Sequence, residues 1–221
     1  FVYELAKALK SLGHNVDIIS GPPYPNLEPK INLIKLPGLD LFSTFVFKER
    51  FKIFFNKKNK SSDDWYEFMS ALLGGFPEIK TFGNRLFHLF QNLSYDILID
   101  NQSLSFGVLQ VQNKIPVIEI VHHPITKDYK YDIKFSKGIV QKISKWRWFS
   151  FLKMQKKVAP FLKVISTPSI NSKNDIVKDF NVSKKKIFVI PNGIDHIKFS
   201  PKKNINRNPG QLITTASADV P

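Results

Sequence analysis

Apolar residues recur with two different periods along the chain, and the two periods alternate. Spacing of three or four positions, which is typical of helices, marks the segments 1–12, 63–73, 84–93, 104–113, 137–158 and 169–180. Short continuous apolar runs predict strands over 16–19, 31–36, 95–100, 116–121, 164–167 and 187–190. Strands that are apolar throughout are typical of a parallel sheet covered on both faces. The pattern therefore predicts an α/β fold, a Rossmann-like parallel sheet with helices on both faces.

The composition changes near residue 200, and this change divides the chain. We expect a large Rossmann-like domain over 1–200, an exposed linker over 201–211, and the first strand of a second domain over 212–221. The chain starts inside a helix and stops soon after a lone strand, which has nothing to pair with. We therefore expect a fragment that is truncated at both ends. Segment 39–60 is aromatic and basic without a clean period, and it receives no assignment.

Composition narrows the class of protein. The chain has no cysteine, which excludes a disulfide framework and a thiolate metal site and fits a cytoplasmic location. No apolar run reaches the ~18 residues of a membrane-spanning helix, and no cluster of His, Asp and Glu has metal-ligand spacing. The net charge of +15 favours phosphate-rich partners: nucleic acid, an anionic lipid surface or a phosphorylated substrate. A lysine-rich, solvated surface without a special function is the alternative explanation of this charge.

Two histidines directly follow a predicted strand. His122 and His123 come after the run 116–121, and ligands bind at the carboxyl ends of strands in open parallel sheets. An imidazole can donate a hydrogen bond to a departing phosphate or orient a hydroxyl near neutral pH. The alternative is a capped or half-buried histidine with a purely structural role.

The last predicted strand of the large domain ends in a bend. Pro191 cannot continue a strand ladder, and the pair Asn192 and Gly193 tolerates positive φ in a sharp turn. Asp195 can accept backbone hydrogen bonds after the turn. We expect this loop to bring backbone close to a ligand cleft.

Serines stand where the strand 164–167 passes into the next helix. Either Ser169 or Ser172 could cap that helix, and Ser172 has Asp175 three positions later, as in a capping box. We interpret these serines first as caps.

Three stretches in this order resemble family 4 of the retaining glycosyltransferases, which have the GT-B fold of two Rossmann-like domains facing across a cleft. They are the helix and its exit into a strand over 4–16, which ends in Gly13-His14-Asn15-Val16, the segment 118–126 with both histidines, and the strand and hinge loop 187–195 with Phe199 and Pro201 after it. The resemblance implies that 1–200 is the N-terminal, acceptor-side domain. It also implies that 212–221 opens the nucleotide-sugar-binding domain.

The resemblance implies transfer of a sugar from a nucleotide diphosphate sugar to an acceptor hydroxyl, with retention of the anomeric configuration. It implies His122 as the catalytic residue of the first domain, and His123, Asn192, Gly193 and Ser169 as substrate-binding residues. No cofactor is implied beyond the donor substrate, and no metal. The family's glycine-rich loop and most of its second domain would lie outside the chain, so we expect the fragment alone to be inactive.

Two other functions stay open. A non-catalytic module could bind nucleic acid or another polyanion, but its aromatic and basic residues would alternate on exposed strands. Here the aromatic residues concentrate in predicted helices and loops, so nucleic acid is not expected as a partner. The second alternative is another GT-B-like enzyme, such as a sugar-nucleotide epimerase or a phosphorylase. The acceptor itself, a glycan, a lipid or a small molecule, is not defined by the sequence.

The predicted helix 137–158 is both basic and aromatic. Its lysines and tryptophans are typical of a helix that lies on anionic lipid, which would place the protein peripherally on the inner face of a membrane. The alternative is a core helix with a solvated lysine face. In that case Ile139, Ile143 and Trp146 would face the sheet.

Overall fold

The computed structural model describes residues 1–44, 46–201 and 209–212. It divides into two compact units, Phe1–Pro191 and Asn192–Pro221, and each is described by itself. The strand expected within 212–221 lies outside the described residues except for Leu212. In chain order the elements are α1 (Val2–Ser11), β1 (Asp17–Ser20), β2 (Asn32–Lys35), α2 (Phe47–Asn56), α3 (Ser62–Leu72), α4 (Glu78–Leu89), β3 (Leu98–Asn101), α5 (Phe106–Val111), β4 (Val117–Ile120), α6 (Thr126–Phe135), α7 (Ile139–Trp148), η1 (Phe149–Phe151), α8 (Leu152–Val158), η2 (Ala159–Phe161), β5 (Val164–Thr167), α9 (Ile170–Phe180), η3 (Lys184–Lys186) and β6 (Ile187–Val189).

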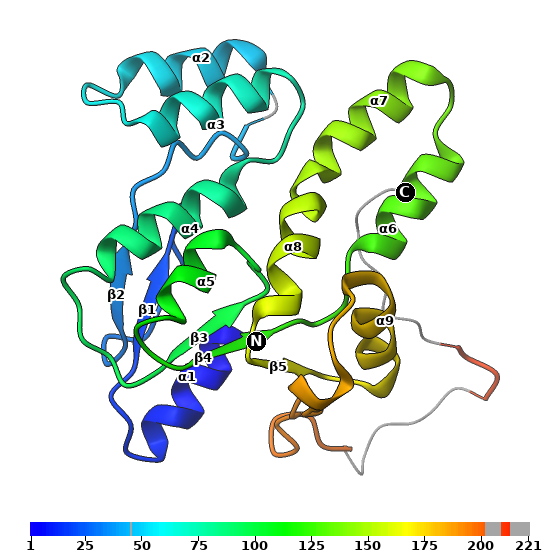
Figure 1. Cartoon of the computed structure of the whole chain (residues 1–221). Helices are drawn as coiled ribbons and strands as arrows, with labels where there is room; N and C mark the ends of the chain where they lie inside the picture. The colour runs from blue at the N-terminus through cyan, green and yellow to red at the C-terminus, as the bar shows by residue number, and fades with distance from the viewer. Residues whose placement is uncertain (45, 202–208, 213–221) are drawn as a thin grey trace. The chain divides into compact units, whose positions relative to one another are not determined.

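The strands of the first unit pair in parallel in two sheets (Figure 1). The smaller sheet pairs β1 with β2, and the larger has the order β3-β4-β5-β6. Each step across the larger sheet follows the chain, with helices in the crossover connections, as parallel strands require. The predicted α/β fold with parallel strands flanked by helices is confirmed, with the strands divided between two sheets.

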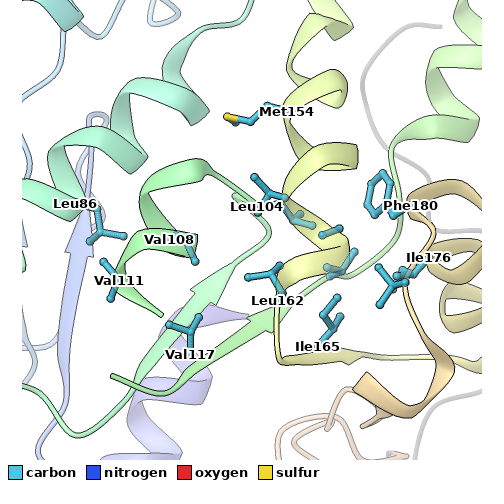
Figure 2. Packing of buried hydrophobic residues seen from close by; sticks show 14 of the residues in the cluster. Leu86, Leu104, Val108, Val111, Val117, Met154, Leu162, Ile165, Ile176 and Phe180 are labelled. Atoms are coloured by element: carbon cyan, nitrogen blue, oxygen red, sulfur yellow. The ribbon is translucent and has the colours of Figure 1, made fainter. Parts of the chain in front are cut away.

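Apolar side chains of the larger sheet and its helices form the main core (Figure 2). Val108 of α5, Ile165 of β5 and Ile176 of α9 are all fully buried in it. Ile19 and Leu36, from the smaller sheet and its exit, pack against the same cluster. The two sheets therefore share one core although no strand pair joins them among the described residues.

Two glycines allow α4 and α5 to touch. A Cβ atom built on Gly107 would overlap the carbonyl group of Gly83 and lie 2.9 Å from its Cα. A Cβ on Gly83 would in turn collide with the side chain of Ser105, the N-cap residue of α5. This close approach fixes the start of α5, directly after the loop that follows β3.

The predicted helix 137–158 is three elements instead of one. α7 contains no buried residue: Ile139 is 77% exposed, Ile143 47% and Trp146 49%, so the expectation that these side chains face the sheet is wrong. The reason is that α7 packs on α6, a helix that the pattern did not predict, and only α8 reaches the main core. Between them, η1 has about three residues per turn, which brings Phe149 and Phe151 closer to one face, and both are buried.

The unassigned segment 39–60 contains α2, which packs on α3 through aromatic rings. Phe54 stacks on Phe68 with ring centroids 4.0 Å apart, and this forms a second small core. The helix predicted over 84–93 begins earlier, at Glu78. Among the described residues, no helix combines the length and the apolar composition needed to cross a bilayer.

Candidate functional site

His122 lies at the carboxyl edge of the larger sheet. In β4 and the residue after it, the side chains of Val117, Ile120 and Val121 are buried. The backbone N–H of Val121 still donates to the carbonyl of Ser166 at 2.8 Å. The next residue, His122, is therefore the first that can turn away from the sheet. The exits of β3 and β5 lie on either side, since the strands are parallel neighbours.

Three segments hold His122 in place. Its backbone N–H donates to Oε1 of Gln102 at 2.8 Å, and its carbonyl accepts from Oγ of Ser172 at 2.9 Å. Its ring Nε2 lies 2.9 Å from Oδ1 of Asn101. The ring of Phe1 meets the imidazole edge-on, with centroids 4.7 Å apart. The imidazole is thus oriented by the exit of β3, by α9 and by the start of the chain.

The imidazole of His122 is biased toward its neutral form. Partial burial lowers its pKa, and the neighbouring charge of His123 lowers the pKa further. An amide oxygen only accepts hydrogen bonds, so the contact with Asn101 places the ring proton on Nε2. Nδ1 then has a lone pair, and no hydrogen bond to it occurs among the described residues.

His123 is exposed and points to a different partner. Its side chain is 60% exposed, and its Nε2 lies 3.3 Å from Oδ2 of Asp128 on α6. Its carbonyl accepts from Nε2 of Gln102 at 3.0 Å. Gln102 therefore contacts the backbone of both histidines. The structure brings the two predicted residues together but gives their rings different surroundings.

Of the two serines that the sequence offers as the cap of α9, Ser169 is the one that caps it. Its Oγ accepts from the backbone N–H of Ser172 at 3.0 Å. Ser172 lies inside the helix, so the alternative of a capping box from Ser172 to Asp175 is wrong; Asp175 pairs instead with Lys127 at 2.6 Å. Ser172 turns its hydroxyl to the carbonyl of His122, which links Ser169 to the site through one residue.

The sequence did not single out Asn101 and Gln102 as site residues, and it indicated Ser172 only as a helix cap. Asn101 ends β3 and Gln102 follows it, so the carboxyl-edge argument that found His122 applies to them equally. Ser172 gave a weaker signal, because serine in the first turn of a helix is common for capping alone. These three residues and Phe1 contact His122 directly.

Asn192 and Gly193 belong to the second unit. Neither residue has positive φ, so that expectation for the bend is wrong. The turn is instead held by Asp195, whose Oδ1 accepts from the backbone N–H groups of Ile197 at 3.0 Å and Lys198 at 2.9 Å. The role of Asp195 as an acceptor is confirmed, and the substrate-binding role of Asn192 and Gly193 stays a prediction.

A second cluster of charges lies between α3 and α4. Glu67 is 2% exposed, and it accepts from Nη1 of Arg85 at 2.5 Å and from the hydroxyl of Thr81. Arg85 also pairs with Asp64 at 3.1 Å. Burial and the nearby carboxylate of Glu67 raise the pKa of Glu78 to about 7. This cluster holds α3 on α4, and within the described residues no group of three or more His, Asp or Glu side chains could bind a metal ion.

Comparisons with known proteins agree with this geometry. The model of Glycosyltransferase Family 4 matches residues 1–198. The chain is also similar to MMP alpha-(1->4)-mannosyltransferase of Mycolicibacterium hassiacum, at 36% identity over 225 aligned residues that cover 100% of this chain and 53% of the relative. The chain thus spans about half the length of this relative. The family match extends over both predicted histidines and the parallel sheet that carries them, and the chain belongs to glycosyltransferase family 4.

Proposed function

We propose that the full-length protein transfers a sugar from a nucleotide diphosphate donor to a hydroxyl of a glycan acceptor, with retention of the anomeric configuration. Family membership supports glycosyl transfer. The relative is named as an α-(1→4)-mannosyltransferase, which favours a mannosyl donor and an α-linked product here. The observation that carries the proposal is His122, an oriented, partly buried imidazole at the carboxyl edge of a parallel sheet.

His122 acts on a sugar hydroxyl in this proposal. With the proton on Nε2 and Asn101 as its acceptor, Nδ1 can accept a hydrogen bond from a hydroxyl group. A neutral imidazole cannot neutralise a diphosphate, so orienting a hydroxyl is the role that fits the lowered pKa. His123, Ser169, Asn192 and Gly193 are proposed to bind substrate. The proposal includes no metal ion and no cofactor besides the donor.

The test measures both transfer and stereochemistry. The full-length protein is incubated with α-linked nucleotide diphosphate mannose or glucose and an oligosaccharide acceptor, and release of the nucleoside diphosphate is followed with and without EDTA. We expect transfer that EDTA leaves unchanged, and NMR of the product should show an α linkage. A β linkage would refute retention, and release of nucleotide without any product glycan would refute the transfer itself.

We also infer that the pair α6 and α7 contacts an anionic membrane surface. Figure 1 shows the two helices extending together away from the strands. Side chains that are large, apolar and at least 47% exposed gather on them, namely Tyr131, Phe135, Ile139, Val140, Ile143 and Trp146. The same segment carries six lysines and one arginine against two aspartates over residues 127–147. Exposed apolar side chains among lysines complement a surface of anionic lipid.

Vesicle flotation tests this contact. The wild-type full-length protein should float with vesicles that contain phosphatidylglycerol, less so at high salt, and not with pure phosphatidylcholine. The variant I139S/V140S should lose flotation. The control I170S removes another exposed isoleucine, 68% exposed on α9, and should float like wild type. Equal flotation with neutral vesicles, or a dimer formed through this face without lipid, would refute the inference.

A further inference from the structure

Two carboxyl groups face each other beneath the site. Asp100 on β3 and Glu119 on β4 are register partners, and their exposed fractions are 6% and 0%. Burial raises the pKa of Glu119 well above its ordinary value, and the adjacent charge of Asp100 raises it further. Oε2 of Glu119 is buried without a donor partner among the described residues. A proton on Glu119 would supply the missing hydrogen bond.

Both carboxyl groups hold the loop that follows β3. Oδ2 of Asp100 accepts from the backbone N–H of Ser103 at 2.8 Å, and Oε1 of Glu119 accepts from that of Leu104 at 3.3 Å. This loop contains two non-glycine residues with positive φ, Gln102 at 65° and Leu104 at 45°. Such a conformation is strained for residues with a side chain and persists only where the surroundings impose it.

The side chain of Leu104 supports the same loop from below. Leu104 is fully buried, and Figure 2 shows it pointing toward α8 within the main core. From α8, Nε2 of Gln155 also lies 3.4 Å from the carbonyl oxygen of Gln102 and 3.3 Å from that of Ser103. The loop is therefore held by the buried side chain of Leu104 and by hydrogen bonds between its backbone and the buried side chains of Asp100, Glu119 and Gln155.

The loop is also the part of the chain that orients His122. Asn101 and Gln102 provide the contacts to its ring and its backbone. A change at Glu119 can therefore reach His122 through these two residues. Resting on the proposed function, we propose that Glu119 is a positioning residue for sugar transfer: as a neutral acid hydrogen-bonded to Asp100, it holds residues 101–105 in the conformation that orients His122.

Two variants of the full-length protein separate this role from mere packing. Glu119→Gln keeps a neutral donor and an acceptor, and we expect its kcat to stay within about threefold of wild type. Glu119→Leu keeps the approximate volume of the side chain but removes its hydrogen-bond donor and acceptor. We expect its kcat to fall at least tenfold, with little change in KM for the nucleotide sugar. Equal activity of Glu119→Leu and wild type, or equal loss in both variants, would overturn the proposal.

Two measurements do not depend on activity. The infrared spectrum at pH 7 should contain the band of a buried protonated carboxyl that is absent in Glu119→Gln and present in the control Glu78→Gln, whose own carboxyl titrates near pH 7. NMR of the His122 imidazole should show the Nε2-protonated tautomer in wild type and Glu119→Gln, and its loss in Glu119→Leu. A spectrum without the carboxyl band would overturn the proposal even if the enzyme transfers sugar. If the protein shows the carboxyl band and the Nε2-protonated tautomer but transfers no sugar, the proposed function is refuted, and the effect of Glu119 on His122 is not.

Discussion

The contact between α4 and α5 gives a prediction that links stability to the site. Replacing Gly107 by alanine places a methyl group inside the backbone of Gly83, where no side chain can rotate away. Overpacking of this kind costs about 1–3 kcal/mol, and collision with backbone puts Gly107→Ala at the upper end. Alanine regains about 1 kcal/mol of helix propensity over glycine. We therefore expect a net loss of about 2 kcal/mol, or a melting temperature lower by about 4–8 °C for a domain of this size.

Thermal unfolding of the full-length protein measures this loss, and the matched control is Gln110→Ala, an exposed position on the same helix. The control should melt within a degree or two of wild type, since surface substitutions stay within about 0.5 kcal/mol. Because α5 starts directly after the loop that contacts His122, Gly107→Ala should also lower kcat at a temperature where it is folded. An unchanged melting temperature would show that α4 and α5 do not touch as described.

Three further predictions concern other described interactions. Arg85→Met leaves the carboxylates of Glu67 and Asp64 buried without this partner, and chemical denaturation should show a loss of about 3–5 kcal/mol, against no more than about 1 kcal/mol if the cluster is solvated. Ser61→Ala removes the capping box of α3, and the same assay should show a loss of about 1 kcal/mol, whereas no loss would mean that the box contributes nothing. Because the lowered pKa keeps His122 neutral, kcat should fall on the acid side only below about pH 6.5, and an acid limb above pH 7 would contradict the neutral imidazole.

The alternation of helices and strands was predictable because the buried strands are short, mostly apolar runs between helical patterns. β4, β5 and β6 lie within the predicted segments 116–121, 164–167 and 187–190. α6 was not predicted, and α7 was predicted as a helix without its correct packing: the rule that apolar residues face a core gives the wrong side when a helix packs on another helix and leaves its apolar face exposed. α2 was missed for a related reason: it packs on α3 in a small aromatic cluster and not on the sheet.

The site was predictable in position but not in its contacts. The carboxyl-edge rule located His122, because a strand exit can be recognised from the end of an apolar run. Its partners depend on positive φ at Gln102 and Leu104, which is rare for such residues and has no local signal. Glu119 was hidden for a similar reason: a glutamate inside an apolar strand is informative only when the carboxyl group of Asp100 beside it is known.

The most direct test of the central claim is the turnover of His122→Ala in the full-length enzyme, beside His123→Ala as the matched control. His122 has an oriented ring, whereas the side chain of His123 is 60% exposed and its ring Nε2 lies 3.3 Å from Oδ2 of Asp128. With a nucleotide diphosphate sugar and a glycan acceptor, the catalytic role of His122 predicts a ten- to thousand-fold lower kcat for His122→Ala, on the order of the contribution of one positioned catalytic group, and a smaller effect for His123→Ala. A kcat for His122→Ala equal to that of wild type would contradict it.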